Sequence, residues 1–485
     1  VTSRRGKGRR GALRYAAYVL AADGTVESTD LGEAGAIDGK VTELRRAIIE
    51  RSDDARRLGR EVDQALMRPI RPLLRGARTL FVSLDGLLHL VPLGALVDEN
   101  DNFLVESLSF THLTTGRDLL RFATPQPSSG DPIIVADPDF GGGADGGAGT
   151  RAMVRLEGMR FPPLPGTAEE AKALASLIAG AVVLTGGDAT ETALRKVHGP
   201  PILHIATHGY FLTDQIQTIT DSRALVLQET PAPEASKPKL LELRDPLLRS
   251  GLALRGANDL SGASSKAGDG LLTALEASSL DLLGTKLVVL SACETGVGEV
   301  RNGDGIYGLR RALAMAGAET QIMSLWKVDD EATRDLMIAF YQGLTKGGGR
   351  TESLRRAQLD AIGKPARAHP YFWAAFLVSG DPRTLDGQAV EPKFTKEPPH
   401  YDPPPGRLPA GVGGCACGIV SAEHQRSRAM VLLLACGLLL VPWARRRARR
   451  RTCSRARARS ARAGTVRAPR RYPVRQTRLS SAPIA

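Results

Sequence analysis

Cysteine is scarce in this sequence and almost confined to its last part. The chain of 485 residues contains five cysteines, and Cys293 is the only one before residue 415. This scarcity excludes a disulfide framework in residues 1–414, and no cysteine spacing is typical of a zinc site. We expect neither a metal ion nor an organic cofactor. Cys293 is therefore either a small buried hydrophobic residue or a reactive thiol.

Lysine and acidic residues are absent from residues 444–485, which contain 15 arginines. The chain's net charge of +13 belongs to this tail, because residues 1–443 carry a net charge of −2. A nearly neutral globular part gives no reason to expect a specific nucleic-acid partner. The tail is rich in Arg, Ala and Ser, a composition that favours disorder.

Long apolar runs are also missing. No apolar segment follows the basic residues 1–10, so we expect no signal peptide. Residues 429–443 carry no charge, but as a helix they would span only about 22 Å of the roughly 30 Å hydrocarbon core. An arginine cluster begins at Arg445, and basic residues orient a span toward the cytoplasm. We expect one short transmembrane helix here, with the tail inside and Cys293 outside; a buried core helix is the alternative.

Apolar strands alternate with helical segments between about residues 80 and 380. Strands such as LVVL and ILHIA are apolar almost throughout, which is typical of a parallel sheet covered on both sides. We predict an α/β fold with a mostly parallel sheet and helices on both faces. The predicted division is 1–78, strands and helices that pack on the core; 79–382, the core; 383–414, a disordered Pro-rich linker; 415–451, a cysteine motif, the span 429–443 and an arginine cluster; and 452–485, a disordered basic tail.

Two of the predicted strands end in residues that could act together. One delivers His208 followed by Gly209, and the other delivers Cys293. Sites in parallel α/β sheets form at the carboxyl ends of strands. If the two strands are neighbours, the His208 imidazole can take the proton of Cys293, and the thiolate can attack an acyl group. The backbone N–H groups of Gly209 and Cys293 would then hold the oxyanion.

A single cysteine or histidine after a strand is more often a packed core residue, and only the pair at matched strand ends favours chemistry. His204 either supports the base or is a buried structural histidine. Asp329 and Asp330 either line a pocket for a basic side chain or cap the next helix. Glu294 is a turn residue or a pocket residue. The sequence lacks the G-x-S-x-G elbow, which disfavours an α/β-hydrolase esterase.

Eight stretches, which cover about residues 12–382, resemble in order the CHAT family of caspase-like cysteine peptidases. They are LDGLLHLVPLGAL, LPGTAEEAKAL, HIATHGYF, SGLALRG, LVVLSACETGVGE, GIYGLRRALAMAGA, SLWKVDDEAT and HPYFWAAFLVSG. The resemblance implies a caspase-like fold. It also implies a cysteine endopeptidase that cleaves proteins or peptides with Cys293 as nucleophile and His208 as general base, through a thioester acyl-enzyme. A catalytically inactive interaction scaffold in bacterial signalling is the alternative.

The resemblance also implies helical repeats, either in a partner protein or in a longer form of the chain. The C-terminal order of GGCACG, apolar run and arginine cluster resembles a myxobacterial surface-sorting signal. That resemblance implies processing or lipid attachment at Cys415 or Cys417. We expect attachment to a membrane through residues 429–443, at the outer membrane or cell surface, with the catalytic domain outside the cytoplasm; a cytoplasmic location is the alternative.

Overall fold

The structure is a computed structural model that describes residues 12–141, 160–211, 246–259, 268–291, 299–301, 305–398 and 431–434. These residues belong to one compact unit, residues 1–439. Cys293, Glu294, Cys415, Cys417 and the tail 452–485 lie outside the described residues. Their expected roles therefore stay predictions.

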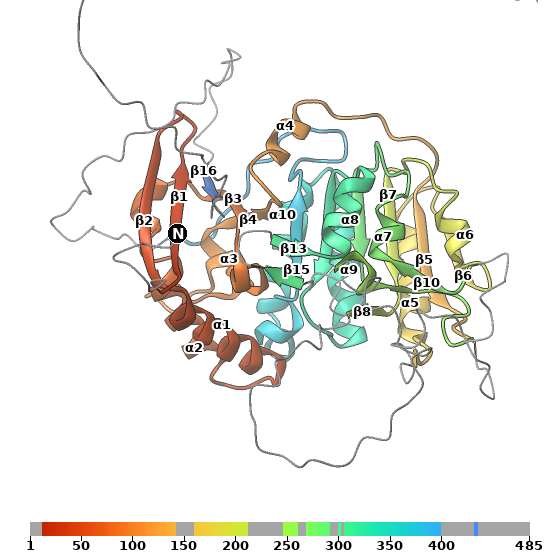
Figure 1. Ribbon diagram of the computed structural model, residues 1–485, viewed down its shortest axis with the longest axis horizontal. Coiled ribbons are helices and arrows are strands. Elements are labelled where there is room, and N and C mark those ends of the chain that lie inside the picture. The colour runs from red at the N-terminus through yellow and green to blue at the C-terminus, as the bar shows by residue number, and fades with distance from the viewer. Residues whose placement is uncertain are drawn as a thin grey trace, which may run out of the picture. The chain divides into compact units, whose positions relative to one another are not determined.

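An eleven-stranded sheet runs through the unit in the order β2-β1-β16-β3-β4-β15-β14-β11-β7-β5-β6 (Figure 1). The strands are β1 (Arg14–Leu20), β2 (Val26–Glu33), β3 (Thr79–Ser83), β4 (Ser109–His112), β5 (Ile133–Pro138), β6 (Val182–Gly186), β7 (Ile202–Ala206), β11 (Leu287–Leu290), β14 (Thr320–Ser324), β15 (Phe376–Gly380) and β16 (Val431–Leu434). Strands β14, β11, β7, β5 and β6 form one parallel block. Strands β15, β4, β3 and β16 form a second, and the blocks meet antiparallel at β14 and β15. The predicted mostly parallel sheet is confirmed.

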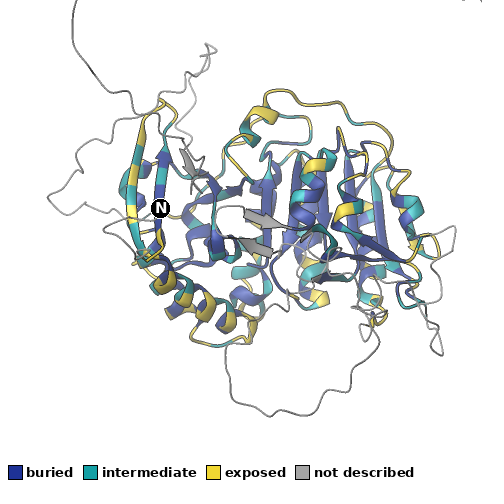
Figure 2. Cartoon of the chain, in the orientation of Figure 1, coloured by how far each residue is buried: buried dark blue, intermediate teal, exposed yellow. Residues whose placement is uncertain are grey.

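Helices cover both faces of this sheet, as predicted. On one face α5 (Pro165–Leu177), α9 (Asp330–Thr345) and α10 (Arg350–Ile362) share a hydrophobic core with the strands, and α1 (Ala34–Ile49) and α2 (Ala55–Leu66) extend that core beside β1 and β3. On the other face α6 (Glu191–Leu194), α7 (Ala274–Ala277) and α8 (Leu309–Ala316) pack on a second core. Figure 2 shows the central strands as the most buried layer and the outer sides of α1 and α2 as exposed, whereas the edge strands β2 and β6 contain no buried residue.

Shorter elements connect these layers. They are the helices α3 (Leu104–Ser107) and α4 (Asp118–Phe122), the 3-10 turns η1 (Arg71–Leu74), η2 (Gly86–Leu90), η3 (Leu93–Ala95), η7 (Pro246–Leu248), η8 (Pro365–Arg367) and η9 (Pro370–Phe372), and the strands β8 (Gly209–Phe211), β9 (Ser250–Ala253), β10 (Leu271–Thr273), β12 (Glu299–Arg301) and β13 (Gly305–Tyr307). Strands β10, β9 and β8 form a small antiparallel sheet that begins directly after β7.

The alternation of side chains along β7 positions its single histidine. Every residue of β7 and β11 is buried, and successive side chains of a strand point to opposite faces. Leu203 and Ile205 contribute to the core under α7 and α8. Ile202 and Ala206 contribute to the core under α5 and α9, so His204 points to that face as well.

Residues 431–434, inside the predicted transmembrane run, form strand β16 between β1 and β3. The structure therefore differs from the predicted helix over these four residues, and the rest of 429–443 lies outside the described part. A strand here pairs backbone groups of β1 and β3 that would otherwise lie unpaired within the sheet. Among the residues that the structure describes, no helix is long and apolar enough to cross a membrane.

Candidate active site

The two strands that lead to the predicted dyad are direct neighbours. β7 and β11 pair in parallel, with Ile205 opposite Leu290. The pairing continues past the strands, because the Ser291 N–H donates to the carbonyl of Ile205 over 2.9 Å. Three residues beyond the pair Ile205 and Leu290, the sequence has His208 on one side and Cys293 on the other. The condition stated from the sequence, that the strands be neighbours, is met.

The ring of His208 is held from one side by backbone and aromatic groups. Its Nε2 lies 2.8 Å from the carbonyl oxygen of Pro162, and the rings of Phe140 and Phe161 lie 5.2 and 5.7 Å away, centroid to centroid. A carbonyl oxygen only accepts, so Nε2 carries the proton and donates it. The other nitrogen, Nδ1, then keeps its lone pair and can act as a base.

The surroundings also favour the neutral form of this imidazole. Burial lowers the pKa of His208 below its usual value, and the positive charge of Lys327 lowers it further. The Pro162 carbonyl and Asp330 raise the pKa of His208, but do not reverse the shift. A neutral imidazole near pH 7 is the form that a general base requires.

The backbone N–H of Gly209, one of the two predicted oxyanion donors, is directed by the pairing of β8 with β9. β8 pairs antiparallel with β9, and the Ala253 N–H donates to the carbonyl of His208 over 2.9 Å. Backbone groups of successive residues in such a pair point to opposite sides. The Gly209 N–H therefore points away from β9 and is not used by that ladder. The second predicted donor, the N–H of Cys293, lies outside the described residues.

His204 contacts a carboxylate below the site. Its Nδ1 lies 3.1 Å from the hydroxyl of Tyr341 on α9, and its Nε2 lies 3.2 Å from Oε1 of Glu170 on α5, although not aligned as a hydrogen bond. The Ser291 hydroxyl donates to Oε2 of Glu170 over 3.1 Å. His204 and Glu170 are both buried, and burial raises the pKa of Tyr341 well above its usual value. None of these contacts reaches His208.

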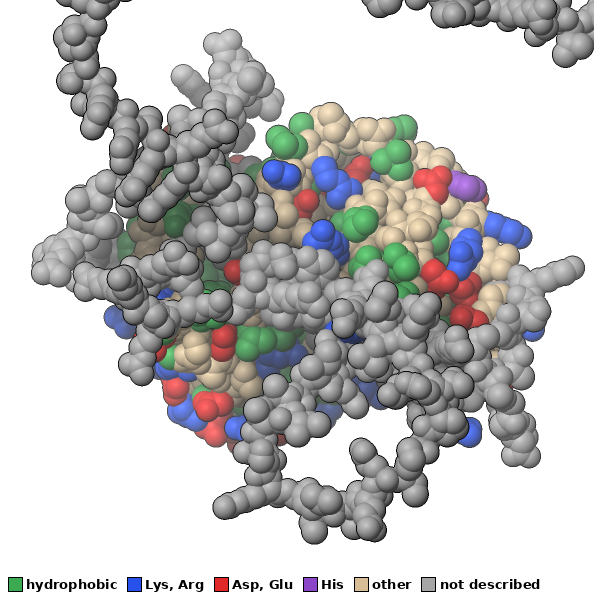
Figure 3. Space-filling view, viewed as in Figure 1, with side chains coloured by type: hydrophobic (Ala, Val, Ile, Leu, Met, Phe, Trp, Pro, Cys, Tyr) green, Lys and Arg blue, Asp and Glu red, His purple; other side chains and the backbone are tan. Residues whose placement is uncertain are grey.

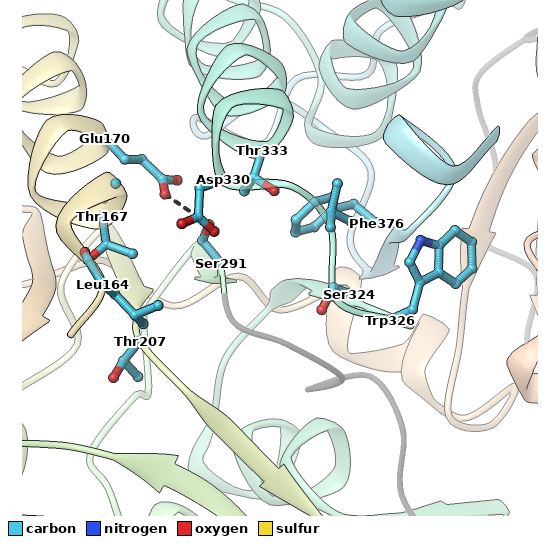
Figure 4. A pocket seen from close by; sticks show the side chains of 12 residues that line it. Leu164, Thr167, Glu170, Thr207, Ser291, Ser324, Trp326, Asp330, Thr333 and Phe376 are labelled. Atoms are coloured by element: carbon cyan, nitrogen blue, oxygen red, sulfur yellow. Dashed lines mark hydrogen bonds between the residues drawn. The ribbon is translucent and has the colours of Figure 1, made fainter. Parts of the chain in front are cut away.

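A pocket opens above this buried group, between the ends of β7, β11 and β14 and the first turns of α5 and α9 (Figure 4). It encloses about 450 Å³ of empty space, part of it open to solvent. Its lining residues are Leu164, Gly166, Thr167, Glu170, Thr207, Ser291, Ser324, Trp326, Val328, Asp330, Thr333 and Phe376. The pocket thus has both apolar and hydroxyl side chains in its lining and contains two acids, one buried and one at its rim.

The two neighbouring aspartates have separate roles. Asp329 caps α9, since its carboxylate accepts from the Ala332 N–H over 3.1 Å, and it lies 3.5 Å from Arg367. Asp330 is exposed and lines the pocket instead. A Cβ atom at Gly166 would lie 3.0 Å from the Cβ of Asp330. Glycine at this position therefore lets α5 approach the acidic rim closely.

Glu170 and Pro162 were not identified as site residues from the sequence. A signal for Glu170 was present, because the buried residues Thr167, Glu170, Ala171 and Leu174 of α5 follow the spacing of an inward helix face. Pro162 acts through its backbone carbonyl, which the sequence does not reveal. Among the described residues no group of three or more His, Cys, Asp or Glu side chains could hold a metal ion.

The visible described surface carries charges of both signs. In Figure 3, Lys and Arg side chains are interspersed with Asp and Glu side chains. Neither sign gathers into a broad patch on that face.

The family model for the CHAT domain matches residues 56–381. Tetratricopeptide repeat protein 28 from Mus musculus is 28% identical over 335 residues, and its counterpart from Homo sapiens is 27% identical over 338 residues. Each match covers 64% of this chain but only 13% and 12% of the two relatives. The chain therefore spans about an eighth of the length of these relatives.

Solved structures of distant sequence also resemble the chain. The separase–securin complex of Saccharomyces cerevisiae matches with 14% identity and a TM-score of 0.35, covering 62% of this chain and 15% of the matched chain. The Arg-specific cysteine proteinase gingipain R matches with 10% identity and a TM-score of 0.38, covering 66% of this chain and 68% of the matched chain.

Proposed function

We propose that this chain, which belongs to the CHAT domain family, is a cysteine endopeptidase with Cys293 as nucleophile and His208 as general base. The observation that carries the proposal is the register of β7 and β11. It pairs Ile205 with Leu290, and in the sequence His208 and Cys293 each follow that pair by three residues. The Pro162 carbonyl supports it further, because it leaves Nδ1 of His208 with a free lone pair.

The proposed reaction follows from these groups. His208 Nδ1 takes the thiol proton, and the Cys293 thiolate attacks the scissile carbonyl carbon. The Gly209 and Cys293 N–H groups hold the oxyanion of the tetrahedral intermediate. When the C–N bond breaks, protonated His208 gives its proton to the leaving amine and a thioester remains. His208 then removes a proton from water, which attacks the thioester and releases the acid product and the thiol.

We also propose a preference for a basic side chain before the scissile bond. The support is Asp330, whose carboxylate lies at the rim of the pocket that Thr207, the residue before His208, and Ser291 also line. Helix α9 begins with Asp330, followed by Glu331, so the acidic charge is also favoured by the helix dipole. A Lys or Arg side chain of a substrate would meet a negative charge there.

Partners and location are part of the proposal. The relatives named above are tetratricopeptide repeat proteins, and on that ground we propose a helical-repeat partner, in the same or another chain. Membrane or surface attachment, with processing at Cys415 or Cys417, rests on the composition of residues 415–451. Strand β16 competes with it, because residues paired in a sheet cannot cross a bilayer at the same time.

Covalent labelling tests the dyad. An acyloxymethyl ketone or iodoacetamide should modify the wild-type chain at Cys293, and no label should appear at position 293 in Cys293→Ala. His208→Ala should react much more slowly at neutral pH, because the thiol loses its base. Equal labelling rates and equal proteolysis in wild type and His208→Ala would contradict the dyad.

A further inference from the structure

The carboxylate of Glu170 lies buried beneath the proposed site, with only 2% of the residue exposed. Burial of a charged group is unfavourable unless polar partners compensate it. The proposed dyad chemistry does not use this side chain, and its neighbour Glu169 reaches solvent. The position of Glu170 on the inward face of α5 therefore indicates a role other than the dyad chemistry.

The two oxygens of Glu170 contact two different strands. Oε2 accepts from the Ser291 hydroxyl over 3.1 Å, directly after β11 (Figure 4). Oε1 lies 3.2 Å from Nε2 of His204 in β7. Tyr341 on α9 holds the other nitrogen of His204 at 3.1 Å. One carboxylate thus joins the two strands that lead to the dyad.

We propose that Glu170 is a positioning residue, which fixes the ends of β7 and β11 relative to each other so that His208 can reach Cys293. The inference rests on the proposed peptidase function. Ser291 is two residues before Cys293, and His204 is four residues before His208. Each contact therefore holds the chain close to one member of the dyad. Neither contact touches the reacting atoms.

The polar character of this connection favours positioning over simple packing. Well-packed apolar residues often stabilise a core as well as a buried ion pair does. The hydrogen bond from Ser291 to Glu170 fixes direction and distance on the β11 side, and the close contact with His204 fixes distance on the β7 side, which apolar contacts do not. A displacement of about 1 Å in a reacting group can reduce a rate about a hundredfold. Loss of the negative charge should therefore change thiol reactivity more than folding.

Helix α5 offers a matched control. Glu169 precedes Glu170, is 67% exposed and pairs with Arg334 on α9 at 2.5 Å. Glu169→Gln removes the same charge from the same helix and leaves the buried carboxylate in place. Glu170→Gln keeps the shape of the side chain but removes the charge and one acceptor oxygen.

The experiment measures iodoacetamide alkylation of Cys293 in the full chain by peptide mass spectrometry, so that the other four cysteines do not contribute. Rates are taken from about pH 5 to 9, which spans the ordinary pKa values of histidine and thiol. The chains compared are wild type, Glu170→Gln, Glu169→Gln, Ser291→Ala and His208→Ala. Thermal unfolding of each chain is recorded in parallel.

Glu170→Gln is expected to alkylate at least about tenfold more slowly than Glu169→Gln at neutral pH, with a rate profile displaced toward that of His208→Ala. Ser291→Ala, which removes one contact, is expected to be about threefold slower. If Glu170→Gln does not fold, the alkylation rate of Ser291→Ala alone tests the positioning role. Rates and profiles equal to those of Glu169→Gln, with His208→Ala still slow, would overturn the positioning role. An unchanged profile in His208→Ala would instead overturn the dyad itself.

Discussion

The two parallel blocks of the sheet are completed in different ways. In the block of β14, β11, β7, β5 and β6, the strands come from residues 133–324, and helices α5 to α9 cover the two faces. In the block of β15, β4, β3 and β16, the last strand comes from residues 431–434, far along the chain from β3. The candidate site lies in the first block. One stretch of the chain thus supplies the strands of the first block, whereas a distant segment completes the second block.

The buried histidines differ between the blocks as well. His204 in β7 meets the Glu170 carboxylate. His112 in β4 instead lies near the Arg310 guanidinium, and its Nδ1 lies 3.2 Å from the carbonyl of Val378. Burial, with the charge of Arg310, lowers the pKa of His112 to about 3 and that of His89 in η2 also to about 3. His204 thus has a carboxylate beside it, whereas His112 and His89 are kept neutral near pH 7 by burial and by the charge of Arg310.

The largest expected effect concerns β16. Leu433→Pro removes a backbone N–H from a strand paired on both sides, where proline is normally excluded. We expect a loss of about 2–3 kcal/mol in the free energy of unfolding. Leu439→Pro, in the same apolar run but beyond β16, is the control. Chemical unfolding of the two variants measures the difference, and equal losses would show that residues 431–434 do not serve as a strand.

A smaller effect concerns His112, whose folded pKa lies below its unfolded value. The unfolded chain then binds more protons as the pH falls, so this residue's contribution to stability is lost from about pH 6.5 down toward pH 3. The slope per residue is at most about 1.4 kcal/mol per pH unit. In His112→Asn this contribution disappears, and the free energy of unfolding should fall less steeply over the same range. An unchanged slope in denaturant titrations at several pH values would contradict a neutral His112.

The smallest expected effect concerns the charges around His208. Lys327 lowers the pKa of His208 and Asp330 raises it. Lys327→Gln should therefore move the acid limb of the alkylation or cleavage rate to higher pH, and Asp330→Asn should move it to lower pH. The maximal alkylation rate should change little in either variant. If the acid limbs of the two variants shift in the same direction, or do not shift, the protonation of His208 does not control the acid limb.

Most of the first block could be predicted from the sequence. LVVL and ILHIA are apolar runs followed by polar residues, and α5 begins with Pro165 at its first position. Buried parallel strands and helix starts are local patterns. Strand order is not local, so neither the antiparallel joint of β14 with β15 nor the place of β16 followed from the pattern.

The site was predictable where its residues have unusual chemistry and hidden where they do not. His208 follows an apolar strand and is followed by glycine, which marks it. Glu170 looks like a solvent-facing helix residue, and only its spacing from Leu174 indicates the buried face. Asp329 and Asp330 share one chemical type, and only the helix start at Asp330 separates the cap from the pocket residue.

Cleavage of a proteome-derived peptide library tests the central claim most directly. The wild-type chain should cut peptides, preferentially after Lys or Arg, and Cys293→Ala should cut none of them. Asp330→Asn should keep cleavage but weaken that preference. A wild-type chain that cuts no more than Cys293→Ala would contradict the proposed peptidase, and this CHAT domain would then act as a non-catalytic scaffold.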